Sequence, residues 1–151
     1  MRLQKILAAL VVSVFFATTS MAMAHVTVRP AEAALAAETI YTVRVPTEGN
    51  VTTTAVELMI PEGVTILSVD GAPGTYELKK SGGRTASIVW KTEIPPGQRA
   101  ELTFTAKNPT SGSEIGWKAI QIYQDSTRAE WVEVKGGKRP APITTLKSAV
   151  P

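Results

Sequence analysis

From residue 25 onward the chain is a succession of short segments rich in valine, isoleucine, threonine and aromatic residues, each bounded by proline or glycine. This composition is typical of β-strands rather than long helices. Because many short strands follow one another at even spacing, we expect an all-β, antiparallel, immunoglobulin-like β-sandwich. The predicted strands are His25–Arg29, Ile40–Val45, Thr53–Met59, Thr65–Val69, Tyr76–Lys80, Ala86–Lys91, Ala100–Ala106, Gly116–Tyr123 and Glu130–Val134.

Alternation within two of these segments indicates which side chains face the core. One face of each segment is entirely apolar: Tyr41, Val43 and Val45 in the first, and Leu102, Phe104 and Ala106 in the second. The connections contain residues that turns require, namely Pro61-Glu62-Gly63, Asp70-Gly71, Ser81-Gly82-Gly83 and Pro95-Pro96-Gly97. These turns support a sequence of antiparallel strands.

Two segments do not fit the strand pattern. Alanine and glutamate in Ala31–Glu38 favour a helix, but eight residues are too few to decide between a helix and a loop. From Lys135 to the end the sequence is rich in proline, glycine and lysine, so we expect a loosely held C-terminal tail. Within this tail, Ile143–Leu146 is a candidate edge strand.

The first 24 residues have the three parts of a secretory signal peptide. Basic Arg2 and Lys5 precede an apolar run over residues 6–17, and small residues close the segment in Ala22-Met23-Ala24. The apolar run is too short for a comfortable membrane span. We therefore expect cleavage after Ala24 rather than an uncleaved N-terminal anchor, and a mature protein in the periplasm or outside the cell.

This cleavage divides the chain into a signal peptide at residues 1–24, a β-sandwich domain at 25–134 and a tail at 135–151. Removing 24 of the 151 residues leaves 127, enough for one domain with a single core. Two of the sixteen basic residues leave with the signal peptide, so 14 basic residues face 13 acidic ones. The near-neutral mature chain shows no basic face for nucleic acid and no later apolar run that would span a membrane.

The sulfur content excludes several kinds of site. The chain has no cysteine, which rules out a thiolate nucleophile, a blue-copper site built on cysteine and a cysteine-rich zinc site. Three of its four methionines lie in the predicted signal peptide, so only Met59 remains. A methionine-rich cuprous site is therefore excluded as well.

His25 is the only histidine in the chain, and cleavage after Ala24 would make it the N-terminal residue. Its free α-amino group and its imidazole Nδ1 would then chelate one metal ion through a six-membered ring. Free amino termini and imidazoles lose their protons near neutral pH, so little proton competition opposes binding. Two nitrogen donors with an oxygen ligand favour Cu(II). The alternative is a surface histidine with no metal.

The remaining ligands must come from carboxylates or water, and the residues alone do not rank the carboxylates. Glu48 follows the segment that ends VRVP, where a turn would bring it beside the first strand, but judged alone it fits a solvated turn carboxylate better. Trp131 either belongs to the core or forms a wall of the metal site. The candidate carboxylates are Glu32, Glu38, Glu48, Glu57, Asp125, Glu130 and Glu133.

The ordered set of motifs resembles the YcnI-like copper-binding domain family over nearly all of the mature chain, from His25 to about Val134. The motifs are AHVTVRP at 24–30, YTVRVPTE at 41–48, ELMIPEGV at 57–64, LTFTAKNP at 102–109 and AEWVE at 129–133. The resemblance implies a cupredoxin-like β-sandwich that binds Cu(II) through a monohistidine brace. In that scheme His25 supplies its amino nitrogen and Nδ1, Glu48 supplies a carboxylate, and Trp131 lies close to the copper.

The implied function is an exported Cu(II)-binding protein in copper homeostasis, which sequesters copper, takes it up or hands it on. The implied partners are the copper ion and a periplasmic copper chaperone or a membrane copper transporter. Family members often carry a C-terminal membrane helix, whereas here a proline- and lysine-containing tail stands in its place. The alternative is a structural or adhesion β-sandwich of the cell envelope without metal. A copper-dependent redox enzyme is disfavoured because the chain has no second imidazole and no thiol.

Overall fold

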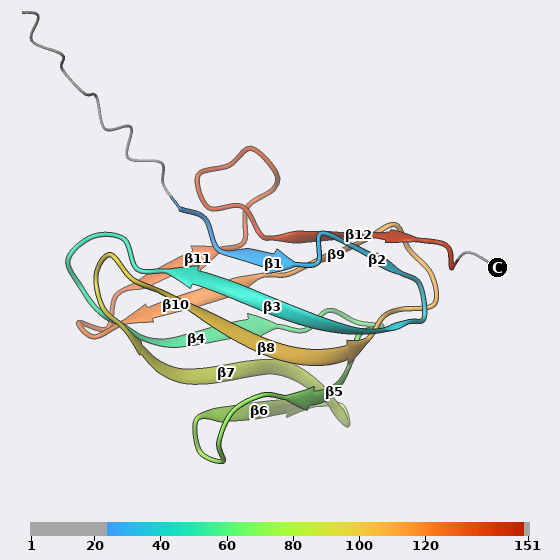
Figure 1. Cartoon of the computed structure of the whole chain (residues 1–151), viewed down its shortest axis with the longest axis horizontal. Coiled ribbons are helices and arrows are strands. Elements are labelled where there is room, and N and C mark those ends of the chain that lie inside the picture. Colours follow the sequence, from blue (N-terminus) through green and yellow to red (C-terminus); the bar gives the residue numbers. More distant parts are fainter. Residues whose placement is uncertain (1–23, 150–151) are drawn as a thin grey trace, which may run out of the picture.

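The computed structural model describes residues 24–149, so the predicted signal peptide, apart from Ala24, lies outside the described residues (Figure 1). Each of the nine predicted strand segments overlaps an observed strand, although Glu130–Val134 does so only at Glu130 and Trp131. No helix within residues 24–149 is long and apolar enough to cross a membrane. The strands of the described part are β1 (Thr27–Arg29), β2 (Glu32–Ala34), β3 (Glu38–Pro46), β4 (Thr53–Met59), β5 (Thr65–Val69), β6 (Tyr76–Ser81), β7 (Arg84–Ile94), β8 (Arg99–Lys107), β9 (Glu114–Gly116), β10 (Ala119–Tyr123), β11 (Arg128–Trp131) and β12 (Ile143–Lys147).

Two antiparallel sheets form the layers of a sandwich (Figure 1). One has four strands in the order β1-β3-β8-β5, and the other has five in the order β11-β10-β4-β7-β6. A smaller sheet of order β2-β12-β9 lies at one side, with β2 and β12 parallel. The predicted all-β antiparallel sandwich is therefore the observed architecture.

The core lies between the two large sheets, and its centre is aromatic. Tyr41 of β3 lies opposite Phe104 of β8 in the sheet register, and their ring centroids are 5.5 Å apart. Trp117 packs against both rings, at 4.9 Å from Tyr41 and 5.5 Å from Phe104. All three side chains are fully buried, as are Val43 and Val45, so the predicted alternation of β3 is confirmed.

The segment Ala31–Glu38 is neither helix nor loop throughout. It contains the short strand β2, followed by a turn in which Ala36 has a φ of 57°. The main-chain groups of this segment find partners outside it: the Leu35 amide donates to Lys147 O, and the Asn108 side chain donates to Ala34 O. Pairing with β12 therefore outweighs the helical preference of alanine.

Strand β12 lies in the predicted C-terminal tail, but it is not an edge strand. It is the central strand of its sheet, between β2 and β9. Thr144 and Leu146 alternate toward the interior and are buried. The edge position was wrong because both sides of β12 hydrogen-bond to main chain, to Ala31–Ala34 on one side and to Glu114–Gly116 on the other.

The predicted strand Gly116–Tyr123 is divided by Trp117 and Lys118. Its first part belongs to β9, which pairs with β12, and its second part is β10, which pairs with β4 and β11. The break lets the Trp117 ring enter the core while the chain passes from one sheet to the other.

Candidate metal centre

The pairing of β1 with β3 determines where the N-terminal residues lie. Thr27 lies opposite Arg44, Val28 opposite Val43 and Arg29 opposite Thr42, so the residues before β1 run alongside those that follow Arg44. In agreement with this antiparallel register, the main-chain nitrogen of Ala24 donates a hydrogen bond to Oε1 of Glu48. The structure thus brings Glu48 to the residue directly before His25.

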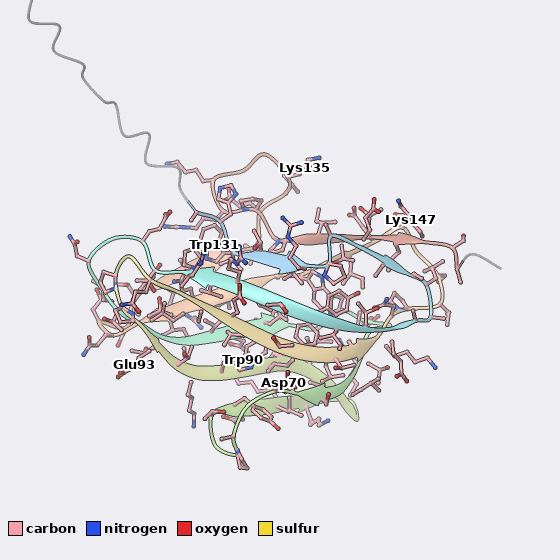
Figure 2. The ribbon with its side chains drawn as sticks, viewed as in Figure 1. Asp70, Trp90, Glu93, Trp131, Lys135 and Lys147 are labelled. Atoms are coloured by element: carbon pink, nitrogen blue, oxygen red, sulfur yellow. The ribbon has the colours of Figure 1, made fainter. Side chains whose placement is uncertain are left out.

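Trp131 approaches the same point from the opposite sheet. It ends β11, and its indole lies edge-on to the imidazole of His25, with ring centroids 5.8 Å apart and an interplanar angle of 60°. Figure 2 shows Trp131 where β1 begins. His25 is exposed, whereas only 4% of the surface of Trp131 is exposed. Trp131 is therefore both a core residue and a wall beside the imidazole.

A hollow of about 250 Å³ lies between Glu48 and Trp131. Three residues that sequence reasoning did not single out also line it, namely Gln121, Tyr123 and Arg139. Arg139 belongs to the loop between β11 and β12, which projects from the sandwich in Figure 1. A second hollow, of about 600 Å³, also borders Glu48 and is lined in part by Ala24 and Arg99.

Burial and the charged groups near the first hollow affect the pKa of Tyr123, which lines it. Burial raises the pKa of the Tyr123 phenol, the guanidinium of Arg139 opposes this effect, and the carboxylates of Glu48 and Asp125 add to it. The phenol thus lies within the influence of one cation and two carboxylates. Arg139 thus adds a positive charge to the hollow that Glu48 also lines.

The loop that carries Arg139 is held by Glu133. The amide of Arg139 donates to Oε2 of Glu133 at 2.7 Å, and the amide of Ala141 donates to the Glu133 carbonyl at 2.9 Å. Gly137 makes this closure possible, because a Cβ atom there would lie 2.8 Å from Cβ of Glu133. The projecting loop is therefore a closed unit beside the site.

Four of the other candidate carboxylates have partners of their own. Lys147 lies 2.8 Å from Glu32, and Ser87 and Lys79 donate to the nearly buried Glu57. Asp125 accepts from Thr127, which lowers the pKa of its carboxyl. Glu133 closes the projecting loop. Glu38 and Glu130 are exposed strand residues. Among the candidates, Glu48 is the one with a hydrogen bond to the N-terminal segment.

The donor set at this point is incomplete if only side chains are counted. Within residues 24–149 no three histidine, cysteine, aspartate or glutamate side chains come together as metal ligands. His25 and Glu48 supply one imidazole and one carboxylate. A metal ion held by these two side chains would need a further donor, which a water molecule or a terminal amine at His25 could supply. Two nitrogens and one oxygen suit Cu(II).

Three comparisons relate the chain to known proteins. The model of the family described as "Domain of unknown function (DUF1775)" matches residues 25–146. The copper-binding protein CutI of Bacillus subtilis (strain 168) is 37% identical over 135 residues, which cover 87% of this chain and 66% of that protein. The chain thus spans slightly less than two thirds of that relative's length.

A crystal structure of an uncharacterized protein from Nocardia farcinica, described as having an immunoglobulin-like fold, matches with a TM-score of 0.71 at 25% identity. The match covers 82% of this chain and 99% of that one. It confirms the predicted immunoglobulin-like sandwich. The family match extends over β12 as well. These matches confirm the resemblance found in the sequence motifs, and the chain belongs to the DUF1775 family.

Proposed function

We propose that this protein is an exported Cu(II)-binding protein that acts in copper homeostasis, by sequestration, uptake or handover, without catalytic turnover. The observation that carries the proposal is the contact of the Glu48 carboxylate with the main-chain nitrogen of Ala24, directly before the only histidine. The related Bacillus subtilis protein, which is named as copper-binding, supports copper as the metal.

In the proposed site the mature chain begins at His25. Its α-amino nitrogen and Nδ1 bind the ion as a chelate, and the Glu48 carboxylate supplies the oxygen ligand and offsets part of the positive charge. Trp131 covers one side of the imidazole and restricts its orientation. The metal is cargo here, because the described residues around His25 provide no second imidazole or thiol to promote redox cycling.

The proposal includes export to the periplasm or beyond, since the amino ligand exists only after removal of residues 1–24. The family match begins at His25, which is consistent with a domain that starts there. A periplasmic copper chaperone or a membrane copper transporter would exchange copper with the site.

The test compares two forms of the protein that both begin at His25, one with a free α-amine and one in which only this α-amine is acetylated. Acetylation converts the His25 amine into an amide with no neighbouring amine to anchor the metal, and it leaves every side chain in place. We expect Cu(II) to bind the free-amine form more tightly by about tenfold or more. Electron paramagnetic resonance (EPR) spectra of the two Cu(II) complexes should also differ.

Equal affinity and identical spectra would contradict the chelate. If neither form binds Cu(II) at micromolar concentration, a structural or adhesion role of the sandwich becomes the better explanation. Mass spectrometry of the exported protein provides the first check, because an N-terminus other than His25 is incompatible with the proposed ligands.

A further inference from the structure

Trp131 ends β11 of one sheet, Glu48 follows β3 of the other, and a buried polar network runs from Trp131 to Thr47, the residue before Glu48. Gln121 of β10 is 1% exposed and lies between the two, surrounded by the inner faces of the sandwich. A buried amide without hydrogen-bond partners would destabilise the fold, so each polar atom of the Gln121 side chain is expected to have a partner.

Each polar atom of the Gln121 side chain has a partner whose chemistry fixes the orientation of the amide. Its Oε1 accepts a hydrogen bond from the indole Nε1 of Trp131 at 3.3 Å. Its Nε2 donates to the carbonyl oxygen of Pro46 at 2.9 Å and to Oγ1 of Thr53 at 2.7 Å. Because an indole N–H only donates and a carbonyl only accepts, the amide cannot be reversed without losing both.

The network continues toward Glu48. Oγ1 of Thr53 lies 2.6 Å from Oγ1 of Thr47, and both residues are buried. Since Thr53 accepts from Gln121, its own proton is available for Thr47. The main chain of Thr47 is held on both sides by the turn before β8, through bonds to Gly97 and Gln98. The residue that follows Thr47 is Glu48.

We propose that Gln121 and Thr53 are positioning residues of the metal site. They hold the Trp131 indole against His25 and fix the Pro46–Thr47 main chain at the same time, so that the imidazole wall and the carboxylate are set before the metal arrives. This inference rests on the proposed function. Residues that orient metal ligands through hydrogen bonds typically contribute about 10- to 100-fold to metal affinity.

The first arm of the experiment uses the metal-free protein that begins at His25. Thr53→Val removes the hydroxyl that joins Gln121 to Thr47 at almost constant shape, and Thr53→Ser retains it. In ¹H–¹⁵N spectra we expect Thr53→Val to shift both the Trp131 indole resonance and the Glu48 amide resonance. The Thr53→Ser spectrum should match wild type at these two signals. The spectrum of Trp131→Phe assigns the indole signal.

The second arm measures Cu(II) binding to the same proteins. We expect Thr53→Val to bind about 10- to 100-fold more weakly, with altered copper hyperfine splitting, and Thr53→Ser to restore both quantities. Thr144→Val is the matched control, because Thr144 accepts from another buried indole, that of Trp117, at 3.0 Å. It leaves an indole N–H unpaired outside the hollow, so it should lower stability without changing the copper spectrum.

The possible outcomes distinguish a failure of the positioning role from a failure of the proposed function. Wild-type Cu(II) affinity and spectrum in Thr53→Val, or a Trp131 indole that does not shift, would overturn the positioning role. If wild type itself binds no Cu(II), the proposed function fails and the positioning role fails with it. Should Thr53→Val not fold, Thr47→Val replaces it. Because this variant breaks only the last link before Glu48, the Glu48 amide resonance and the Cu(II) affinity are then the two quantities that must change, and wild-type values for both would overturn the positioning role.

Discussion

The carboxylate of Glu48 accepts a hydrogen bond from the main-chain nitrogen of Ala24, although the two residues are 24 positions apart in the chain. The contact follows from the antiparallel register of β1 and β3, which places the residues before Thr27 alongside those after Arg44. A carboxylate is therefore brought to the N-terminal segment by the sheet itself.

Replacement of Glu48 tests the oxygen ligand. Glu48→Gln keeps the shape but replaces an anionic oxygen with a neutral amide oxygen, so we expect Cu(II) affinity to fall by about tenfold or more. The EPR hyperfine splitting should change as well. Glu62→Gln is the control. Glu62 is an exposed carboxylate in the turn that follows β4, whereas Glu48 precedes β4, so the two lie at opposite ends of this strand. Equal losses in the two variants would assign the effect to general charge.

Trp131 provides an optical readout of the site. Its ring lies 5.8 Å from the His25 ring between centroids, so bound Cu(II) should quench its fluorescence. We expect Trp131→Phe to lose most of the quenching that wild type shows on titration. Trp90→Phe is the control, because Trp90 is a core residue that packs against Phe104 and lines none of the hollows around Glu48. Full quenching in Trp131→Phe would place copper near another tryptophan.

The fold followed from the sequence where alternation and turn residues agreed. Tyr41, Val43 and Val45 were expected on one buried face and are fully buried. Alternation failed at β10. There it would direct the apolar pair Ile120 and Ile122 inward, yet the structure buries Gln121. A polar residue between two isoleucines gives no local signal of its burial, because its partners come from three other segments.

Part of the candidate site could likewise be predicted from the sequence, and part could not. His25 was identified by its position after the cleavage motif, whereas Glu48 and Trp131 were singled out from several alternatives by family resemblance. Their approach to the N-terminal segment depends on sheet register, which no single segment encodes. Arg139 was placed in a loose tail, but its loop is closed by Glu133 through a side-chain contact that spacing alone does not predict.

Replacement of Gly137 tests whether the closed loop contributes to the stability of the fold. A methyl group at Gly137 would lie 2.8 Å from Cβ of Glu133, so Gly137→Ala must move the loop or the Glu133 side chain. We expect it to lower the free energy of unfolding by about 1–3 kcal/mol. Gly116→Ala has no atom within 4 Å of the added carbon and should change it by less than about 0.5 kcal/mol. Urea denaturation measures both, and equal effects would contradict a tight closure.

Tyr41 connects the aromatic core to a buried polar group. Its hydroxyl donates to Oδ1 of Asn108 at 2.7 Å, and the amide of Asn108 donates to Ala34 O and to Thr39 Oγ1. Burial raises the pKa of the Tyr41 phenol above its ordinary value of 10.0, and the hydrogen bonds with Thr39 and Asn108 partly oppose this rise. The folded protein therefore holds the phenolic proton more tightly than the unfolded chain.

This difference makes stability depend on pH in the alkaline range. A raised pKa in the folded state gives a stabilising contribution that is complete below the unfolded pKa of 10.0 and is lost as the pH rises through the folded value. Tyr41→Phe cannot ionise but leaves Asn108 without its donor, so at neutral pH we expect it to be less stable by about 1–3 kcal/mol. The difference in the free energy of unfolding between wild type and Tyr41→Phe, measured by urea denaturation, should become smaller above pH 10. A gap that stays constant from pH 7 to about 11.5 would show that Tyr41 ionises equally easily in both states.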